Sequence, residues 1–79
     1  MPRLIRYFDK ATEEERGSLF LINPDLKELQ TIFAEPETQP MYDCWPIDSE
    51  KARLLRKFVS EDFVFDFSRH EYFLEYDTD

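Results

Sequence analysis

Aromatic and acidic side chains alternate through residues 62–79, at the end of the chain. Strict alternation of apolar and polar residues with a period of two is typical of a β-strand that buries one face. Two such runs, 62–67 and 71–77, are separated by a short polar turn at residues 68–70. The pattern therefore predicts a C-terminal β-hairpin. One side of this hairpin would be aromatic and face the core, and the other would carry carboxylates together with Phe73.

The length of 79 residues predicts one domain, spanning 1–79. A domain of this size buries only about 60% of its unfolded surface, so it needs bulky side chains in its core. Eight Phe, four Tyr and one Trp provide them. The single glycine, Gly17, predicts few tight turns with positive φ. Cys44 is the only cysteine, which excludes an internal disulfide and favours a reducing compartment.

The formal net charge is -8, from 18 acidic and 10 basic residues. Such a chain repels phosphate backbones and anionic lipid, so direct binding to nucleic acid or to membranes is not expected. The same field attracts basic proteins and can raise association rates roughly 10- to 1,000-fold. The alternative is that the acidic residues only keep the protein soluble. No signal-peptide pattern and no apolar stretch near ~20 residues is present, which favours a cytoplasmic location.

Alternation also marks the beginning of the chain. Residues 3–9 place Ile5 and Tyr7 on one face and Phe8 on the other, which predicts a first strand. A polar loop follows, and the apolar residues 18–22 predict a second strand that pairs back on the first.

Two helices are predicted in the middle of the chain. Asn23 can cap a first helix and Pro24 suits its first position, with apolar residues at helical spacing over 26–33. Residues 48–49 offer two candidate caps for a second helix over 50–59.

A short third strand is predicted within residues 42–47, where Pro46 excludes a central place in a sheet. The expected fold class is α+β: a small antiparallel sheet of about four strands, one or two short helices and the C-terminal hairpin.

Chemistry of an active site is hard to assemble from these residues. One Cys and one His, 26 positions apart, do not make a metal site. Among so many acids, close carboxylate pairs arise from charge density alone, and a domain this small leaves little room for a cleft. We therefore predict no catalysis, no cofactor and no metal. A small hydrolase that uses clustered carboxylates remains the weakest of the alternatives.

Four features occur along the chain: FDKATEE at 8–14, the Asp43-Cys44-aromatic step, the spacing Ile47…Glu50…Leu54-Leu55…Phe58, and HEYFLEYD at 70–77. Together they resemble the cloacin-type immunity proteins, the small inhibitors that protect bacteria from their own ribosome-cleaving colicins and related bacteriocins. The order and overall length agree, and the similarity is strong at both ends and weak over residues 21–39.

The resemblance implies a mainly antiparallel β fold that binds the basic cytotoxic ribonuclease domain of a partner toxin, one to one, beside its active site. The protein would then be cytoplasmic, or released in complex with the toxin. Matching by position implies a contact surface from the first strand and its loop, the Asp43 region and the last strand. Its members are Phe8, Asp9, Glu13, Glu14, Glu15, Asp43, Cys44, Trp45, Phe73, Glu75 and Asp77.

Within this surface, the period-two pattern independently turns Phe8, Phe73 and Glu75 outward. We expect the two phenylalanines to hold the partner and the acids to steer it. Cys44 and Trp45 would discriminate between related toxins, or else pack in the core. The rival interpretation is an acidic adaptor domain that binds a different basic protein. The sequence leaves open which toxin is bound, which RNA that toxin cuts and whether the free protein dimerises.

Overall fold

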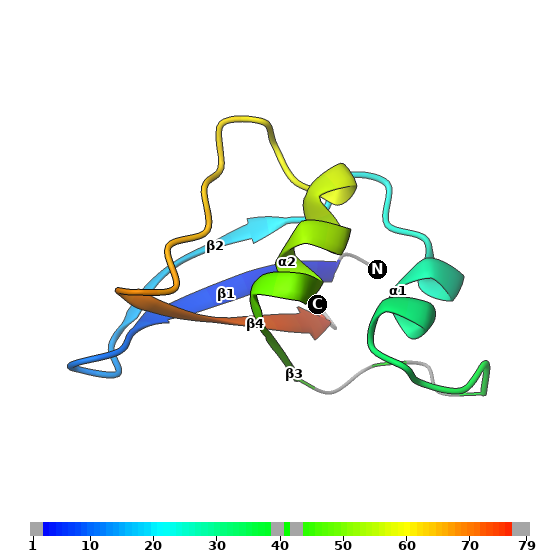
Figure 1. Cartoon of the computed structure of the whole chain (residues 1–79), viewed down its shortest axis with the longest axis horizontal. Coiled ribbons are helices and arrows are strands. Elements are labelled where there is room, and N and C mark those ends of the chain that lie inside the picture. Colours follow the sequence, from blue (N-terminus) through cyan, green and yellow to red (C-terminus); the bar gives the residue numbers. More distant parts are fainter. Residues whose placement is uncertain (1–2, 39–40, 42–43, 77–79) are drawn as a thin grey trace.

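A four-stranded antiparallel sheet with two short helices makes up the fold in the computed structural model, which describes residues 3–38, 41 and 44–76 (Figure 1). The predicted α+β fold class is confirmed. The elements are β1 (Arg3–Asp9), β2 (Glu15–Phe20), α1 (Leu26–Ile32), β3 (Trp45–Ile47), α2 (Ser49–Leu55), a 3-10 turn (Arg56–Phe58) and β4 (His70–Tyr76).

The two ends of the chain meet at the centre of the sheet. The strand order is β2-β1-β4-β3, and β1 pairs with β4 over its whole length, from Arg3 opposite Tyr76 to Asp9 opposite His70. The predicted first strand, 3–9, has the observed bounds. Every side chain of β1 and β4 is therefore assigned to one face or the other by a single register.

One face of the sheet carries the helices and the core. Ile5, Leu29 and Leu55 are 0% exposed and Leu74 is 1% exposed, so both helices bury apolar side chains against the central strands. In Figure 1, α2 crosses in front of the sheet. Burying these side chains contributes roughly 1.5–3 kcal/mol each.

The predicted C-terminal hairpin is wrong in one respect: residues 61–69 form no strand. One edge of β4 pairs with β1 over its whole length, and β3 occupies the middle of the other edge at Tyr72–Leu74, where a hairpin partner would have to pair. The rings of Phe63, Phe65 and Phe67 instead pack around Tyr72, with centroids 6.1, 4.9 and 5.1 Å away. Val64 between them is 75% exposed, so the alternation reflects burial without strand pairing.

Tyr72 also holds this segment through its hydroxyl. The backbone N–H of Asp66 donates to the Tyr72 hydroxyl oxygen at 2.7 Å. Burial raises the pKa of Tyr72, because the phenolate would lose solvation inside the aromatic cluster. The neutral phenol is therefore favoured, and the hydrogen bond ties the loop to β4.

The middle elements differ from their predicted bounds by a few residues. Asp25 caps α1, its carboxylate accepting the N–H of Lys27 at 3.0 Å, whereas the predicted cap Asn23 adopts a positive φ of 49° two residues earlier. Of the two predicted caps for α2, the structure uses Asp48, which accepts the N–H of Lys51 at 2.8 Å. The short β3 lies at the edge of the sheet, which tolerates the missing N–H of Pro46.

The second strand begins earlier than predicted, at Glu15, and so includes Gly17. Gly17 lies opposite Tyr7, and the register then shifts so that Phe8 faces Glu15, which leaves Arg16 as the extra residue of a bulge. The Tyr7 ring covers Gly17 so closely that a Cβ there would lie 2.7 Å from the hydroxyl oxygen and 2.9 Å from Cζ.

Gly17→Ala should therefore destabilise the protein by about 1–3 kcal/mol, because the Tyr7 ring must move out of a packed position. Urea unfolding at 25 °C measures the change in the free energy of unfolding. Ser18→Ala, one residue along the same strand and on its other face, is the matched control and should change little. Equal losses of stability in the two variants would show that a clash between the Tyr7 ring and a Cβ at position 17 does not cause the destabilisation.

The scarcity of glycine does not prevent turns with positive φ. Four described residues other than glycine adopt such a conformation: Glu13, Asn23, Ala34 and Met41. Ala34, with φ 56°, ends α1: its N–H donates to the Thr31 carbonyl at 3.2 Å and the next N–H, of Glu35, donates to the Gln30 carbonyl at 2.7 Å. This is the Schellman arrangement, in which glycine usually occupies the position of Ala34.

Ala34→Gly should stabilise the protein by about 0.5–1 kcal/mol. The left-handed conformation costs a non-glycine residue roughly 1–2 kcal/mol, and glycine removes this cost. The greater freedom of glycine in the unfolded chain offsets about 0.4–1 kcal/mol of the stabilisation. Thermal or urea unfolding measures it. Ala11→Gly, in a turn and without positive φ, is the control and should be neutral or destabilising; a loss of stability in Ala34→Gly contradicts the argument.

Candidate functional site

The sheet face opposite the helices is the candidate site, and we call it the open face. Strand partners that lie directly opposite each other share a face, so the registers define its members. They are Leu4, Arg6 and Phe8 of β1, Glu15, Ser18 and Phe20 of β2, Pro46 of β3, and Glu71, Phe73 and Glu75 of β4. Among the described residues, no helix or strand lies over this face.

An aromatic pair lies at the centre of the open face. Phe8 and Phe73 are diagonal neighbours on β1 and β4, with ring centroids 5.8 Å apart in an edge-to-face arrangement at 72°. Both rings are half-buried although no described helix or strand covers them. Phe20, at the end of β2, is 58% exposed. The predicted outward orientation of Phe8 and Phe73 is confirmed.

Arg6 lies between acidic residues on this face. Its Nη1 bonds to Oε1 of Glu75, and its Nε lies 3.6 Å from Oε1 of Glu15, within ion-pair distance but too far for a hydrogen bond. The Glu75 side chain is 20% exposed, against 55% for Glu15. Glu75 is therefore held in place more firmly than Glu15. With Glu71 included, the open face carries three carboxylates and one guanidinium.

The β1–β2 turn projects beyond the end of the sheet (Figure 1), and acidic residues lie in it. Asp9 organises this turn: its Oδ1 accepts the N–H groups of Thr12 and Ala11, at 3.1 and 2.7 Å, and its Oδ2 lies 3.2 Å from Arg16. These hydrogen bonds, that of Thr12 first, lower the pKa of Asp9. Asp9 therefore builds the turn, while Glu13 and Glu14 are exposed at its tip.

The predicted residues at and before β3 lie on different sides of the sheet. Cys44 is exposed, and its Sγ lies 3.8 Å from Oε2 of Glu75, at the rim of the open face. Trp45 lies instead on the helix-covered face, where it packs against the core and its Nε1 donates to Oε1 of Glu35 at 2.9 Å. Core packing, the alternative to contact, is the correct assignment for Trp45. The last two predicted residues, Asp43 and Asp77, lie outside the described residues.

Arg6, Glu71 and Phe20 were not predicted as part of the site. Period two places Glu71 on the same face as Phe73, and Arg6 on the same face as Phe8, so that signal was present in the sequence. The ion pairs of Arg6 could not be predicted from this alternation, because they form only when β2 and β4 flank β1.

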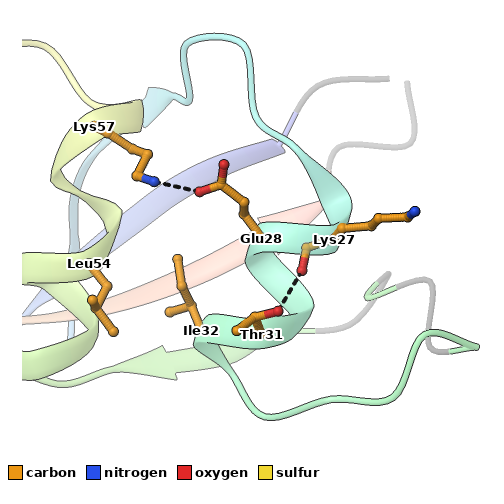
Figure 2. Close-up of a pocket in the computed structure, with 6 residues that line it drawn as sticks. All are labelled: Lys27, Glu28, Thr31, Ile32, Leu54 and Lys57. Carbon is orange, nitrogen blue, oxygen red and sulfur yellow. Dashed lines mark hydrogen bonds and ion pairs between the residues drawn. The ribbon is translucent and has the colours of Figure 1, made fainter.

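A groove of about 370 Å³ lies between α1 and α2, on the helix side of the molecule. Figure 2 shows Ile32 and Leu54 pointing into it, while the side chain of Lys27 extends away. Two of its polar side chains are paired: Lys57 Nζ lies 2.6 Å from Glu28 Oε2, and the Thr31 hydroxyl donates to the Lys27 carbonyl at 3.0 Å (Figure 2). This groove therefore presents no converging reactive groups.

Within residues 3–38, 41 and 44–76, no three His, Cys, Asp or Glu side chains are grouped so that they could hold a metal ion. None of the helices in that part of the chain has the length and apolar character needed to cross a bilayer.

Comparison with known proteins places the chain in a family. The family model DUF7683, described as a domain of unknown function, matches residues 2–75, and the chain belongs to this family. A search of curated proteins finds no match.

Arg6→Met should destabilise the protein by roughly 1 kcal/mol, because Glu15 and Glu75 lose their shared cation on a partly exposed surface. Urea unfolding in 20 mM and in 1 M NaCl measures this, and the difference from the parent should shrink at high salt. Arg6→Lys keeps the positive charge but lacks the planar guanidinium, so its stability should lie between that of the parent and that of Arg6→Met. If Arg6→Met unfolds like the parent at both salt concentrations, the ion pairs do not organise the open face.

Proposed function

We propose that this protein is a bacteriocin immunity protein, which binds and neutralises the basic ribonuclease domain of a ribosome-targeting toxin through the open face. The observation that carries the proposal is the Phe8–Phe73 pair, left uncovered at the centre of a sheet face that bears Glu15, Glu71 and Glu75. Uncovered aromatic groups with a charged rim are typical of protein-binding surfaces.

The charge of the chain supports a basic partner. An enzyme that grips ribosomal RNA must neutralise phosphates with Lys and Arg, so its surface is cationic. A partner with a net charge of -8 attracts such an enzyme over a distance of about a Debye length, ~8–10 Å in physiological salt. After binding, it would inhibit by blocking access to the ribosome and by repelling ribosomal RNA. No catalysis and no cofactor enter this function.

The position of the resembling stretches also supports the proposal. The stretch 8–14 covers the end of β1 and the turn that follows, and the stretch 70–77 includes the whole of β4. These segments lie far apart in the sequence but side by side in the sheet, because Phe8 is opposite Glu71 and Asp9 is opposite His70. The two stretches that most resemble cloacin-type immunity proteins therefore lie next to each other in the sheet.

A division of roles follows from the geometry. Phe8 and Phe73 are the anchors, since large aromatic groups that become fully desolvated dominate binding energy. Glu13 and Glu14 are exposed at the turn and steer the partner, which affects mainly the association rate. The site of action is the cytoplasm of the toxin-producing cell, where newly made toxin would otherwise meet ribosomes.

Phe73→Ala should raise the dissociation rate of the toxin complex about 30-fold or more, as expected for loss of a hot-spot aromatic group. Glu13→Gln with Glu14→Gln should lower the association rate up to about tenfold at low salt and leave dissociation nearly unchanged. Surface plasmon resonance against a colicin-type ribonuclease domain, ideally the one encoded beside this protein, measures both rates.

The control pair, Glu37→Gln with Glu50→Gln, makes the same change in net charge on the helix side and should slow association less. A cell-free translation assay tests inhibition itself, and rescue should be complete at a one-to-one ratio. A complex that forms without rescue of translation would favour an acidic adaptor. Absence of any complex with a neighbouring toxin would refute the proposal.

A further inference from the structure

A small hollow lies where β3 ends. The last residue of β3, Ile47, is opposite Tyr72, and the chain then turns away into α2. The first two residues of β4, His70 and Glu71, therefore have β1 on one side and, in the described part of the chain, no strand on the other. The hollow at this edge has a volume of about 260 Å³.

Half of the residues that line the hollow are aromatic, and one is acidic. The aromatic residues are Phe67, His70, Tyr72 and Phe73, the acidic one is Glu71, and the others are Lys10, Pro46 and Ile47. Phe67 and Tyr72 pack against each other with centroids 5.1 Å apart, so these walls are held by the aromatic cluster of the core. Glu71 is exposed, and no ion pair involves it among the described residues.

We propose that this hollow, which we call the edge pocket, binds an arginine side chain of the partner protein. A guanidinium is planar, stacks on aromatic faces and is less strongly hydrated than an ammonium, so ring-lined walls favour arginine over lysine. Its two parallel N–H groups match the two oxygens of a carboxylate such as Glu71. That the partner is a basic ribonuclease rests on the proposed function; the chemistry of the pocket does not.

The edge pocket is continuous with the open face. Phe73 belongs to both, as the neighbour of Phe8 on one side and as a wall of the pocket on the other. Glu71 lies opposite Phe8 in the register and also lines the pocket. A partner seated on the aromatic pair would therefore bring a neighbouring side chain directly to this edge.

Lys10 is the opposing charge, since it also lines the edge pocket. A cation already at the pocket repels an incoming guanidinium, so removing the charge of Lys10 should strengthen binding of arginine. The proposal therefore predicts the direction of both effects. Glu71→Gln weakens the binding of arginine, and Lys10→Met strengthens it. A pocket that accepts an acidic side chain would show the reverse.

The test is an NMR titration of the full chain with N-acetyl-arginine amide, with N-acetyl-lysine amide and N-acetyl-norleucine amide as matched probes. We expect arginine to bind most tightly and to shift the amide signals of Ile47, His70 and Phe73. Glu71→Gln should weaken binding, and Lys10→Met should tighten it, by about two- to fivefold each, the range for a partly exposed ion pair. Both positions are exposed, so folding should persist, and Glu50→Gln is the control.

Equal affinity for norleucine and arginine, or tighter binding in Glu71→Gln, would overturn the proposal. The same variants, measured against the ribonuclease domain, separate this idea from the proposed function. Arginine binding without a ribonuclease complex leaves the edge pocket standing and refutes the immunity role. A ribonuclease complex whose dissociation rate is the same for the parent and for Glu71→Gln refutes the edge pocket alone.

Discussion

The pairing of β1 with β4 is the constraint on which the rest of the molecule depends. Seven residue pairs in one antiparallel register join the beginning of the chain to its end. That register places Ile5 beside Leu74 and Tyr7 beside Tyr72 on the covered face. A slip of one residue would exchange the faces of a strand, exposing its core side chains and burying charges such as Arg6. The core and the open face are therefore two consequences of one alignment.

Much of this alignment could be predicted from the sequence, because both strands alternate cleanly and bury only one side. The bounds of β1 and the outward orientation of Phe8, Phe73 and Glu75 followed from period two alone. The hairpin did not, since alternation reports which side chains are buried and says nothing about strand partners. Whether 62–67 can pair depends on β3 reaching the far edge of β4, and that contact is set by a strand of only three residues.

The same limit applies within the candidate site. Trp45 sits on β3, which is too short to show a period, so its face could be learned only from its pairing with Leu74. The role of Asp9 in the turn depends on the backbone conformation after β1, where Glu13 adopts a φ of 63°. Arg6 was recognisable as outward-facing, but its two acidic neighbours come from strands on either side of it. Tertiary neighbours, more than local pattern, determine what each polar side chain does.

Arg6 divides the acids of the candidate site into two groups with different physical effects. Glu75, and more weakly Glu15, are oriented by its guanidinium, so a partner that binds them does not need to order them first. Glu13 and Glu14 have no such support and remain exposed, which suits attraction over a distance and adds little once contact is made. The oriented acids lie on the strands that carry Phe8 and Phe73, or on the strand next to them, while the exposed acids lie at the turn. For a partner bound as proposed, the oriented acids would lie beside the aromatic anchors on the paired strands and the steering acids at the end of the sheet, because strand pairing fixes a carboxylate next to an aromatic ring and an exposed turn does not.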